Sequence, residues 1–124
     1  MNDTVTSLPR PTPSRALRAL SFWHDVTLRT LRNLPYDLSA RQAGIMLTVY
    51  LQTQTHSIKS LSEALGISKP AVCRAIDTLE QLKFVKRQRD KDDKRNVLIQ
   101  RTVKGSVYLS EFADIILSVS KAAA

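Results

Sequence analysis

The fold is decided by one stretch from residue 57 to residue 105, SIKSLSEALGISKPAVCRAIDTLEQLKFVKRQRDKDDKRNVLIQRTVKG. Its pattern predicts a short helix, a tight turn, a second helix and then a basic two-stranded hairpin. The turn lies at Gly66, which adopts positive φ at low cost and can end the first helix. Ile67 supplies an apolar plug between the helices, and Ser68 caps the second one. This order of elements is a winged helix-turn-helix.

The second helix has two chemically different sides when its residues are spaced at about 100° each. Its apolar side holds Val72, Ala75, Ile76, Leu79 and Leu82, and its polar side holds Pro70, Arg74, Asp77 and Gln81. The N-terminal half is expected to be free to meet a partner; it consists of Ser68, Lys69, Pro70, Ala71 and Arg74. In helix-turn-helix proteins that half enters the major groove, where an arginine can pair with a guanine edge. The alternative is a solvated face of an ordinary core helix.

The hairpin is expected to have arms at residues 84–89 and 96–100, joined by a fully charged tip. Seven lysines and arginines lie between residues 83 and 95, which suits a loop on a phosphate backbone or in the minor groove. Its candidate DNA contacts are Arg87, Arg89, Lys91, Lys94 and Arg95. Asp93 is expected to hold Arg95 in one direction by an ion pair; the alternative is a surface salt bridge worth roughly 0 to 1 kcal/mol.

The positive charge of the chain is concentrated in the same stretch. The whole chain carries formal charge +8, and residues 57–105 hold 12 Lys and Arg against 6 Asp and Glu, a net of +6. The other 75 residues hold 7 against 5, a net of only +2. This distribution is typical of a nucleic-acid-binding surface and predicts binding that weakens steeply with salt.

The stretch resembles the DNA-binding half of MarR-type transcriptional regulators over about 50 residues. The resemblance is carried by Ser57-Ile58, Leu61-Ser62, Leu65-Gly66-Ile67-Ser68, Ala71-Val72, Leu79, Phe84-Val85, Asp92-Asp93-Lys94-Arg95, Thr102 and Lys104-Gly105. It implies a sequence-specific repressor of the bacterial cytoplasm and nucleoid that binds double-stranded DNA as a homodimer. By position, it places recognition-helix contacts at Ser68, Lys69, Pro70, Ala71 and Arg74, the wing arginine at Arg95 and its partner at Asp93. The chain departs from the family pattern at Arg101, where an apolar residue normally packs.

The flanking segments indicate a single mainly α domain with a small β-hairpin wing. Residues 1–13 are expected to form a flexible arm, and residues 14–124 one winged-helix domain. Within it we expect N-terminal helices in 14–55, the DNA-binding part in 57–105 and a dimerisation helix in 106–124. The first helix is expected over 14–34 and the last from Lys104 to about Lys121. Between them, Ser39-Ala40-Arg41-Gln42 resembles a capping box that opens a second helix, which is expected to reach about Gln54.

The apolar residues of these flanking helices predict a dimer. The first helix has an apolar stripe formed by Leu17, Leu20, Trp23, Leu28, Leu31 and Leu34, with Phe22 and Val26 on the opposite face. It therefore carries more apolar surface than one core contact needs, and a second chain is the simplest cover. A two-fold dimer would place two recognition helices about 34 Å apart on a pseudo-palindromic operator.

Other functional classes find less support. No apolar run approaches the ~20 residues of a membrane span, and the N-terminus does not resemble a signal peptide, so a cytoplasmic location is expected. A single Cys73 allows no intrachain disulfide and is expected to be half-buried. His24 and His56 are not surrounded by residues at metal-ligand spacing, so neither a metal, a cofactor nor an enzyme activity is expected. His24 itself is expected to be packed.

Three alternatives stay open. The resemblance implies a crevice for a small aromatic ligand, which Trp23, His24, Met46 and Tyr50 could line; plain core packing is the competing interpretation. The short segment after residue 105 leaves little framework for such a crevice. The chain could also be a protein-interaction module or anti-regulator built on a degenerate winged helix, or a DNA-coating protein without sequence preference. An interaction module would be indifferent to substitution of Arg74.

Overall fold

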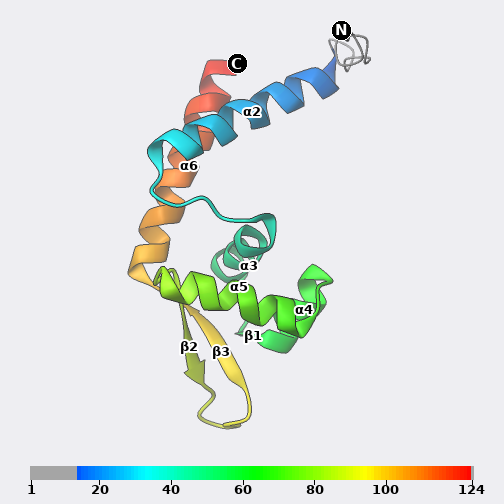
Figure 1. The fold of residues 1–124 in the computed structure, drawn as a ribbon, viewed down its shortest axis with the longest axis vertical. Helices are drawn as coiled ribbons and strands as arrows, with labels where there is room; N and C mark the ends of the chain where they lie inside the picture. The colour runs from blue at the N-terminus through cyan, green and yellow to red at the C-terminus, as the bar shows by residue number, and fades with distance from the viewer. Residues whose placement is uncertain (1–13, 124) are drawn as a thin grey trace, which may run out of the picture.

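The computed structural model describes residues 14–123 and has two parts, a helical arm and a winged-helix lobe (Figure 1). The elements follow in the order α2 Arg15–Asn33, α3 Ala40–Leu51, β1 His56–Ser57, α4 Ile58–Leu65, α5 Lys69–Gln81, β2 Val85–Arg89, β3 Val97–Arg101 and α6 Val103–Ala123. Helices α2 and α6 form the arm, and the elements between them form the lobe. The flexible arm expected over 1–13 lies outside the described residues. None of the described helices has the length and hydrophobicity that a membrane span requires.

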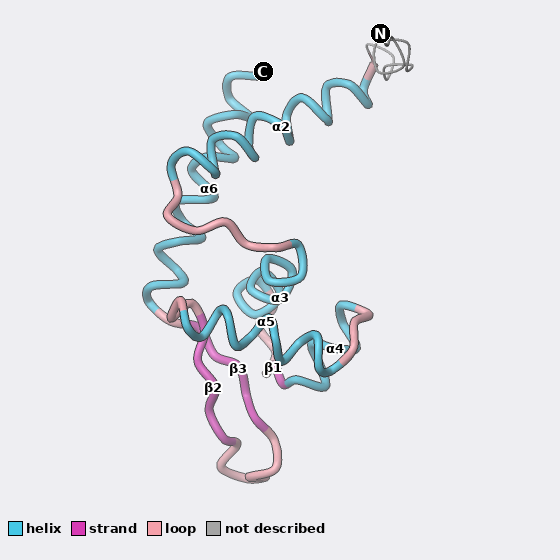
Figure 2. The backbone as a smooth tube through the Cα atoms, viewed as in Figure 1, coloured by secondary structure: helices cyan, strands magenta, loops and turns pink. Residues whose placement is uncertain are grey.

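The lobe combines three helices with a small antiparallel sheet, so the expected winged helix-turn-helix is confirmed (Figure 2). The strand order is β1-β3-β2, and β3 pairs with both neighbours: Ile99 lies opposite His56 on one side and Arg87 on the other. Strand β1, which makes the sheet three-stranded, was not predicted from the sequence. The core of the lobe is formed by Ile45, Met46, Val49, Leu61, Val72, Ala75, Ile76, Leu79, Phe84, Val85, Ile99 and Tyr108.

Side-chain caps set the helix boundaries of the lobe. Ser39 and Gln42 form the expected capping box at the start of α3, and the hydroxyl of Ser68 accepts from the N–H of Ala71 at the start of α5. Helix α4 ends at Gly66, whose φ of 67° lies in the left-handed region, and the N–H of Ile67 bonds back to the carbonyl of Ser62. The turn is therefore encoded in the local sequence.

Arg101 has a different environment from an ordinary apolar strand end. Its guanidinium donates to the carbonyl oxygens of Val49 at 3.0 Å and Gln52 at 3.2 Å. Val49 lies in the last turn of α3 and Gln52 is its C-cap residue, so neither carbonyl has a partner within the helix. The arginine therefore caps the helix, and its positive charge is favourable near the negative end of the helix dipole. Helix α3 accordingly ends at Leu51, three residues before the expected Gln54.

The arm forms where α2 crosses α6. Val26 of α2 and Val119 of α6 are buried, and the guanidinium of Arg29 donates to the Ser118 hydroxyl at 2.9 Å. The contact therefore uses the Val26 face of α2. Of the opposite apolar stripe, Leu28 and Leu34 are half-buried, and the exposed members are Leu17, Leu20, Trp23 and Leu31. The prediction that His24 is packed was wrong: its side chain is exposed, because the face it occupies is directed away from α6. The buried histidine is His56, whose Nε2 lies 3.1 Å from the carbonyl oxygen of Gln52.

Lobe and arm meet at the hydroxyl of Tyr50. It donates to the carbonyl of Phe84 at 2.6 Å and accepts from the N–H of Thr102 at 2.9 Å, so it ties α3 to both ends of the wing. Gly105, in the first turn of α6, packs directly against this hydroxyl. Beside this hydroxyl, the ring centroids of Phe84 and Tyr108 lie 4.6 Å apart. The start of α6 is therefore fixed to the lobe by close packing.

Lys83 is the one non-glycine residue of the described chain with positive φ, at 65°. It follows α5, where the N–H of Phe84 bonds to the carbonyl of Leu79, an arrangement that normally uses glycine. Lys83→Gly is expected to raise the free energy of unfolding by about 0.5 kcal/mol, because relief of backbone strain exceeds the added flexibility of the unfolded chain. Urea denaturation measures it. Lys86→Gly, within β2, serves as the control and should lower stability; a loss in both variants would contradict the assignment of strain.

Candidate nucleic-acid interface

The N-terminal half of α5 presents a polar surface to solvent. Ser68, Lys69, Pro70 and Arg74 are all exposed, as the sequence analysis expected. Ala71 is an exception, because its side chain is only 6% exposed. It faces the helix-turn-helix core, so its assignment to the free surface was wrong. Pro70 lies in the first turn, where a missing N–H removes no helical hydrogen bond.

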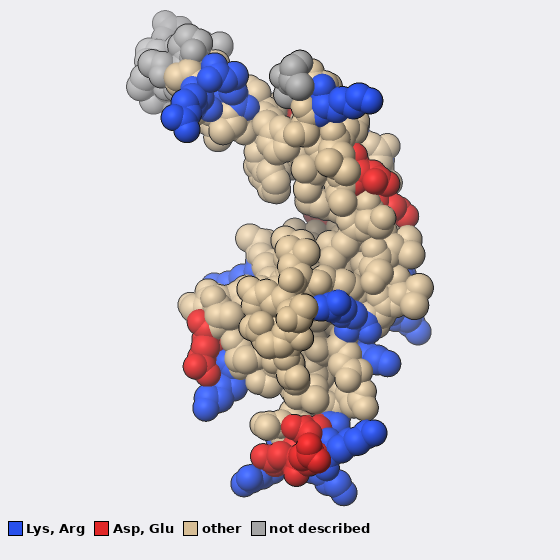
Figure 3. Space-filling model, turned by 180° about the vertical axis from the view of Figure 1, so that it is seen from behind, with Lys and Arg blue, Asp and Glu red and all other residues tan. Residues whose placement is uncertain are grey.

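The wing tip places its basic side chains in solvent. Arg89, Lys91, Lys94 and Arg95 are exposed, and Figure 3 shows basic side chains spreading around an acidic group at this tip. The guanidinium of Arg89 donates to the carbonyl of Lys94 at 2.9 Å, which ties the end of β2 to the loop before β3. The tip is therefore a compact basic projection from the lobe.

Asp93 and Arg95 form the expected ion pair, with Nε of Arg95 3.1 Å from Oδ1 of Asp93. The same carboxylate oxygen accepts from the backbone N–H of Arg95. The guanidinium and then the backbone N–H of Arg95 hold the pKa of Asp93 below its usual value. Because the Arg95 side chain is 91% exposed, the pair orients the guanidinium outward and adds little to stability.

Arg87 lies in a different environment from the other wing cations. Its guanidinium is bound by two carboxylates of α5: Nη2 lies 2.6 Å from Oδ1 of Asp77, and Nη1 lies 2.5 Å from Oε1 of Glu80. The side chain is 29% exposed. From the sequence alone, Arg87 was grouped with the free cations of the hairpin. Its carboxylate partners become apparent only when β2 packs on α5.

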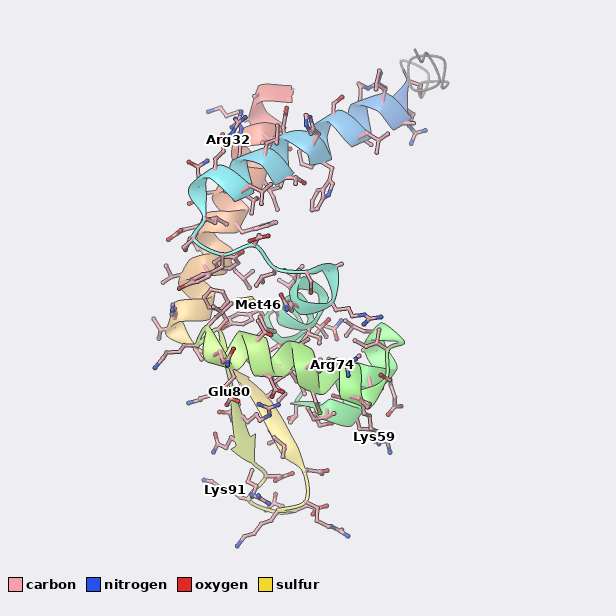
Figure 4. The ribbon with its side chains drawn as sticks, viewed as in Figure 1. Arg32, Met46, Lys59, Arg74, Glu80 and Lys91 are labelled. Carbon is pink, nitrogen blue, oxygen red and sulfur yellow. The ribbon has the colours of Figure 1, made fainter. Side chains whose placement is uncertain are left out.

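One further cation near the interface was missed by the sequence analysis. Lys59 is exposed in the first turn of α4, and Figure 4 shows it on the lobe with Arg74 and Lys91, away from the arm. Its place two residues after the Ser57 cap is the signal that could have found it, because a helix N-terminus and a lysine together favour phosphate. The surface therefore extends over α4, α5 and the wing.

The four residues considered for an aromatic ligand do not share one environment. Met46 is completely buried in the core, the Tyr50 hydroxyl is bonded at the junction, and Trp23 and His24 are exposed on α2. A groove of about 510 Å³ lies elsewhere, between the end of α3 and β3; it is lined by Val49, Thr53, Gln54, Thr55, His56, Leu98, Ile99, Gln100 and Arg101. Its one charged lining group, Arg101, already caps α3.

The described residues contain a single cysteine and no candidate metal site. Over residues 14–123, no three His, Cys, Asp or Glu side chains lie close enough together to hold a metal ion. Cys73 is half-buried in α5, as expected, and is unpaired.

Comparison with known proteins agrees with this fold. A sequence model of the MarR family matches residues 38–97. The solved structure of a MepR–DNA complex from S. aureus superimposes with a TM-score of 0.73 at 22% identity, covering 88% of each chain. The transcriptional regulator Tm0710 from Thermotoga maritima gives 0.69 at 24% identity, covering 86% of this chain and 74% of that one.

A third structure, YusO from Bacillus subtilis, has a TM-score of 0.71 at 16% identity, covering 86% of this chain and 74% of its own. No curated protein sequence matches the chain. At these identities the structures establish the fold, and the family model establishes the kinship of the matched segment. Residues 38–97 are thus a MarR-family segment, carried in a winged helix-turn-helix fold.

Proposed function

We propose that this chain is a dimeric, sequence-specific transcriptional regulator that binds double-stranded DNA, most simply as a repressor that occludes a promoter. The observation that carries the proposal is the joint exposure of Arg74 on α5 and Arg95 at the wing tip, on one lobe that also carries Lys59. The MepR–DNA complex, which has the same fold, supports it. Because its ligand would be the chromosome, the protein would act in the cytoplasm at the nucleoid.

Helix α5 and the wing would have different roles in DNA binding. Helix α5 would lie in the major groove, where Arg74 can donate two hydrogen bonds to a guanine edge and so distinguish sequences. The wing would follow the backbone or enter the minor groove through Arg95, with Arg89, Lys91 and Lys94 near phosphates. The helix would thus supply specificity, and the wing would supply general affinity that falls with salt.

The arm would supply the two-fold symmetry. Leu17, Leu20, Trp23 and Leu31 are exposed on α2, and Val103, Val107 and Leu117 on α6. Such apolar surface on an otherwise packed arm is stabilised by a second copy of the chain. A two-fold axis through the arms would place the two α5 helices about one DNA turn apart, so the operator would be a pseudo-palindrome.

Leu20→Asp is expected to convert the dimer to a monomer without unfolding the chain. The side chain is 56% exposed within one chain, so a charge there costs little until a second chain covers it. Sedimentation at micromolar concentration should show half the mass, with an unchanged helical circular dichroism spectrum. Ser21→Asp, about 100° around the helix, is the matched control and should remain dimeric. A wild-type monomer under these conditions would contradict the proposed assembly.

Selection of bound sequences from a random duplex pool tests the function itself. At about 150 mM salt the proposal expects enrichment of a pseudo-palindrome with half-sites about 10 base pairs apart. A pool that stays random after several rounds would contradict sequence-specific binding. Enrichment of a single half-site would contradict the dimer alone.

A further inference from the structure

The three-residue cluster of Asp77, Glu80 and Arg87 joins the recognition helix to the wing. Asp77 and Glu80 lie one turn apart on α5, and Figure 4 shows Glu80 on the side of the helix that faces the hairpin. Glu80 uses both carboxylate oxygens: Oε1 binds the guanidinium of Arg87, and Oε2 accepts from its backbone N–H at 3.1 Å. The wing strand is therefore held through its side chain and its main chain together.

The position of Arg87 in the sheet makes the position of the wing tip sensitive to this contact. Arg87 is in the middle of β2, opposite the buried Ile99, and shares a strand face with the buried Val85. Strand β2 continues to Arg89 and the turn follows, so the chain from Arg87 to residue 92 spans at most roughly 16 Å, at about 3.3 Å per residue. A rotation of about 10° at Arg87 would move the tip by up to roughly 3 Å, which is enough to break a hydrogen bond to a phosphate.

The charges of the cluster are unfavourable for DNA binding by themselves. Two carboxylates and one guanidinium carry a net charge of −1 beside a surface proposed to meet a polyanion. Asp77 remains 64% exposed, so its charge is not hidden in the core. The N–H of Arg87, followed by its guanidinium, holds the pKa of Glu80 below its usual value and keeps the carboxylate charged. Attraction of DNA therefore cannot explain the presence of Asp77 and Glu80 beside this surface.

We propose that Asp77, Glu80 and Arg87 form a clamp that sets the angle of the wing on the recognition helix. In this role Arg87 is a positioning residue that acts through Arg95 at the wing tip, and it does not contact phosphate. This inference rests on the proposed function for its effect on DNA affinity, but not for its effect on the free protein. It replaces the sequence-based expectation for Arg87 with a structural role.

Glu80→Ala separates a clamp from simple electrostatics, because the two make opposite predictions. Removing an acid from a DNA-binding protein should tighten binding, since the net positive charge rises. If the clamp orients the wing, Glu80→Ala weakens operator binding about tenfold despite the added charge. Glu63→Ala, on α4 of the same lobe, makes the same charge change outside the cluster and should bind as tightly as wild type or slightly more so. Unchanged or tighter binding by Glu80→Ala would overturn the proposal.

Arg87→Lys is a second variant that retains the charge. A lysine ammonium cannot match the two-pronged guanidinium contact with Asp77 and Glu80. The clamp therefore predicts a loss similar to that of Glu80→Ala, whereas a phosphate contact would be largely preserved by lysine. Thermal unfolding of each variant shows whether the lobe is intact. Wild-type affinity for Arg87→Lys would contradict the clamp.

A double-mutant cycle with Arg95→Ala tests whether the clamp acts through the wing tip. In the Arg95→Ala background, Glu80→Ala should cost less than twofold, because the contact that it positions is already absent. Fully additive losses would show that Glu80 acts elsewhere and would overturn the proposed route.

Hydrogen exchange of the DNA-free protein gives a readout that does not depend on the proposed function. Amides at 88–97 should exchange several-fold faster in Glu80→Ala than in wild type or Glu63→Ala, while those of α3 keep their rates. Unchanged wing exchange would overturn the clamp. If the wild type failed to bind any duplex, the proposed function would be lost, and the exchange result alone would decide the clamp.

Discussion

Gly105→Ala is expected to lower the free energy of unfolding by roughly 3 kcal/mol or more, a large fraction of the stability of a small domain. Alanine normally stabilises a helix by about 1 kcal/mol relative to glycine, so the expected sign is reversed here. The added methyl would collide with the Tyr50 hydroxyl and the carbonyl of Phe84, and would lie 2.8 Å from the ring carbon Cζ of Tyr50. A main-chain carbonyl cannot move aside as a flexible side chain can.

Urea denaturation at one fixed protomer concentration measures this effect, because a dimer adds a concentration-dependent term. Ser106→Ala, the exposed next residue of α6, is the matched control and should be neutral or slightly stabilising. Adding Tyr50→Phe to Gly105→Ala removes one of the two collisions and should recover part of the loss. A Gly105→Ala protein as stable as wild type would show that α6 does not pack on the lobe as described.

Arg74→Ala is expected to remove most of the sequence preference while leaving general DNA affinity nearly intact. A guanidinium that pairs with one guanine edge contributes about 1 to 3 kcal/mol of discrimination in each half-site. Two half-sites in a dimer therefore predict a loss of roughly 30-fold to 10⁴-fold in the ratio of operator to scrambled affinity. The Arg74 side chain is exposed, so its removal leaves no cavity.

Titration of the selected operator and of scrambled duplex by fluorescence anisotropy measures that ratio. Arg95→Ala is the informative comparison, because a wing-tip cation should contribute to both duplexes and lower the salt slope by about 1 per half-site. Arg18→Ala, exposed on α2, controls for net charge and should change neither duplex appreciably. An Arg74→Ala protein with the wild-type ratio would contradict recognition by α5.

The features that were predicted correctly from the sequence depend on interactions between residues that are close together in the chain. Ser39 and Ser68 cap their helices through residues three positions away, and Gly66 ends α4 through its own φ. The apolar periodicity of α5 placed Val72 and Ile76 in the core. Helix caps, periodicity and turn residues act within one or two turns, so a reader of the sequence can evaluate them without knowing the fold.

The features that were missed depend on partners far away in the chain or on the choice between two faces. Arg101 reaches carbonyls about fifty residues earlier. The pairing of His56 with Ile99 and of Ser57 with Leu98 creates a strand of two residues with little pattern of its own. His24 lies on an apolar stripe, but the chain buries the opposite face of α2 against α6. Local periodicity identifies apolar faces without saying which one the rest of the molecule covers.

The same distinction applies to the candidate site. The charge pattern located the wing and the pairing of Asp93 with Arg95, because these residues are neighbours in sequence. It could not separate Arg87 from the other basic residues, since only the docking of β2 on α5 brings Asp77 and Glu80 to the guanidinium. Ala71 was misplaced although its spacing carried the signal: it lies four residues before the buried Ala75, on the same side of α5.

Recognition of a DNA sequence by this winged helix can be measured as the ratio of wild-type affinities for the selected duplex and a scrambled duplex of the same composition, at about 150 mM salt. We expect a ratio of about 10³ or more, with both affinities falling as salt rises. Equal affinities that fall together with salt would leave only charge attraction and would contradict sequence recognition by α5.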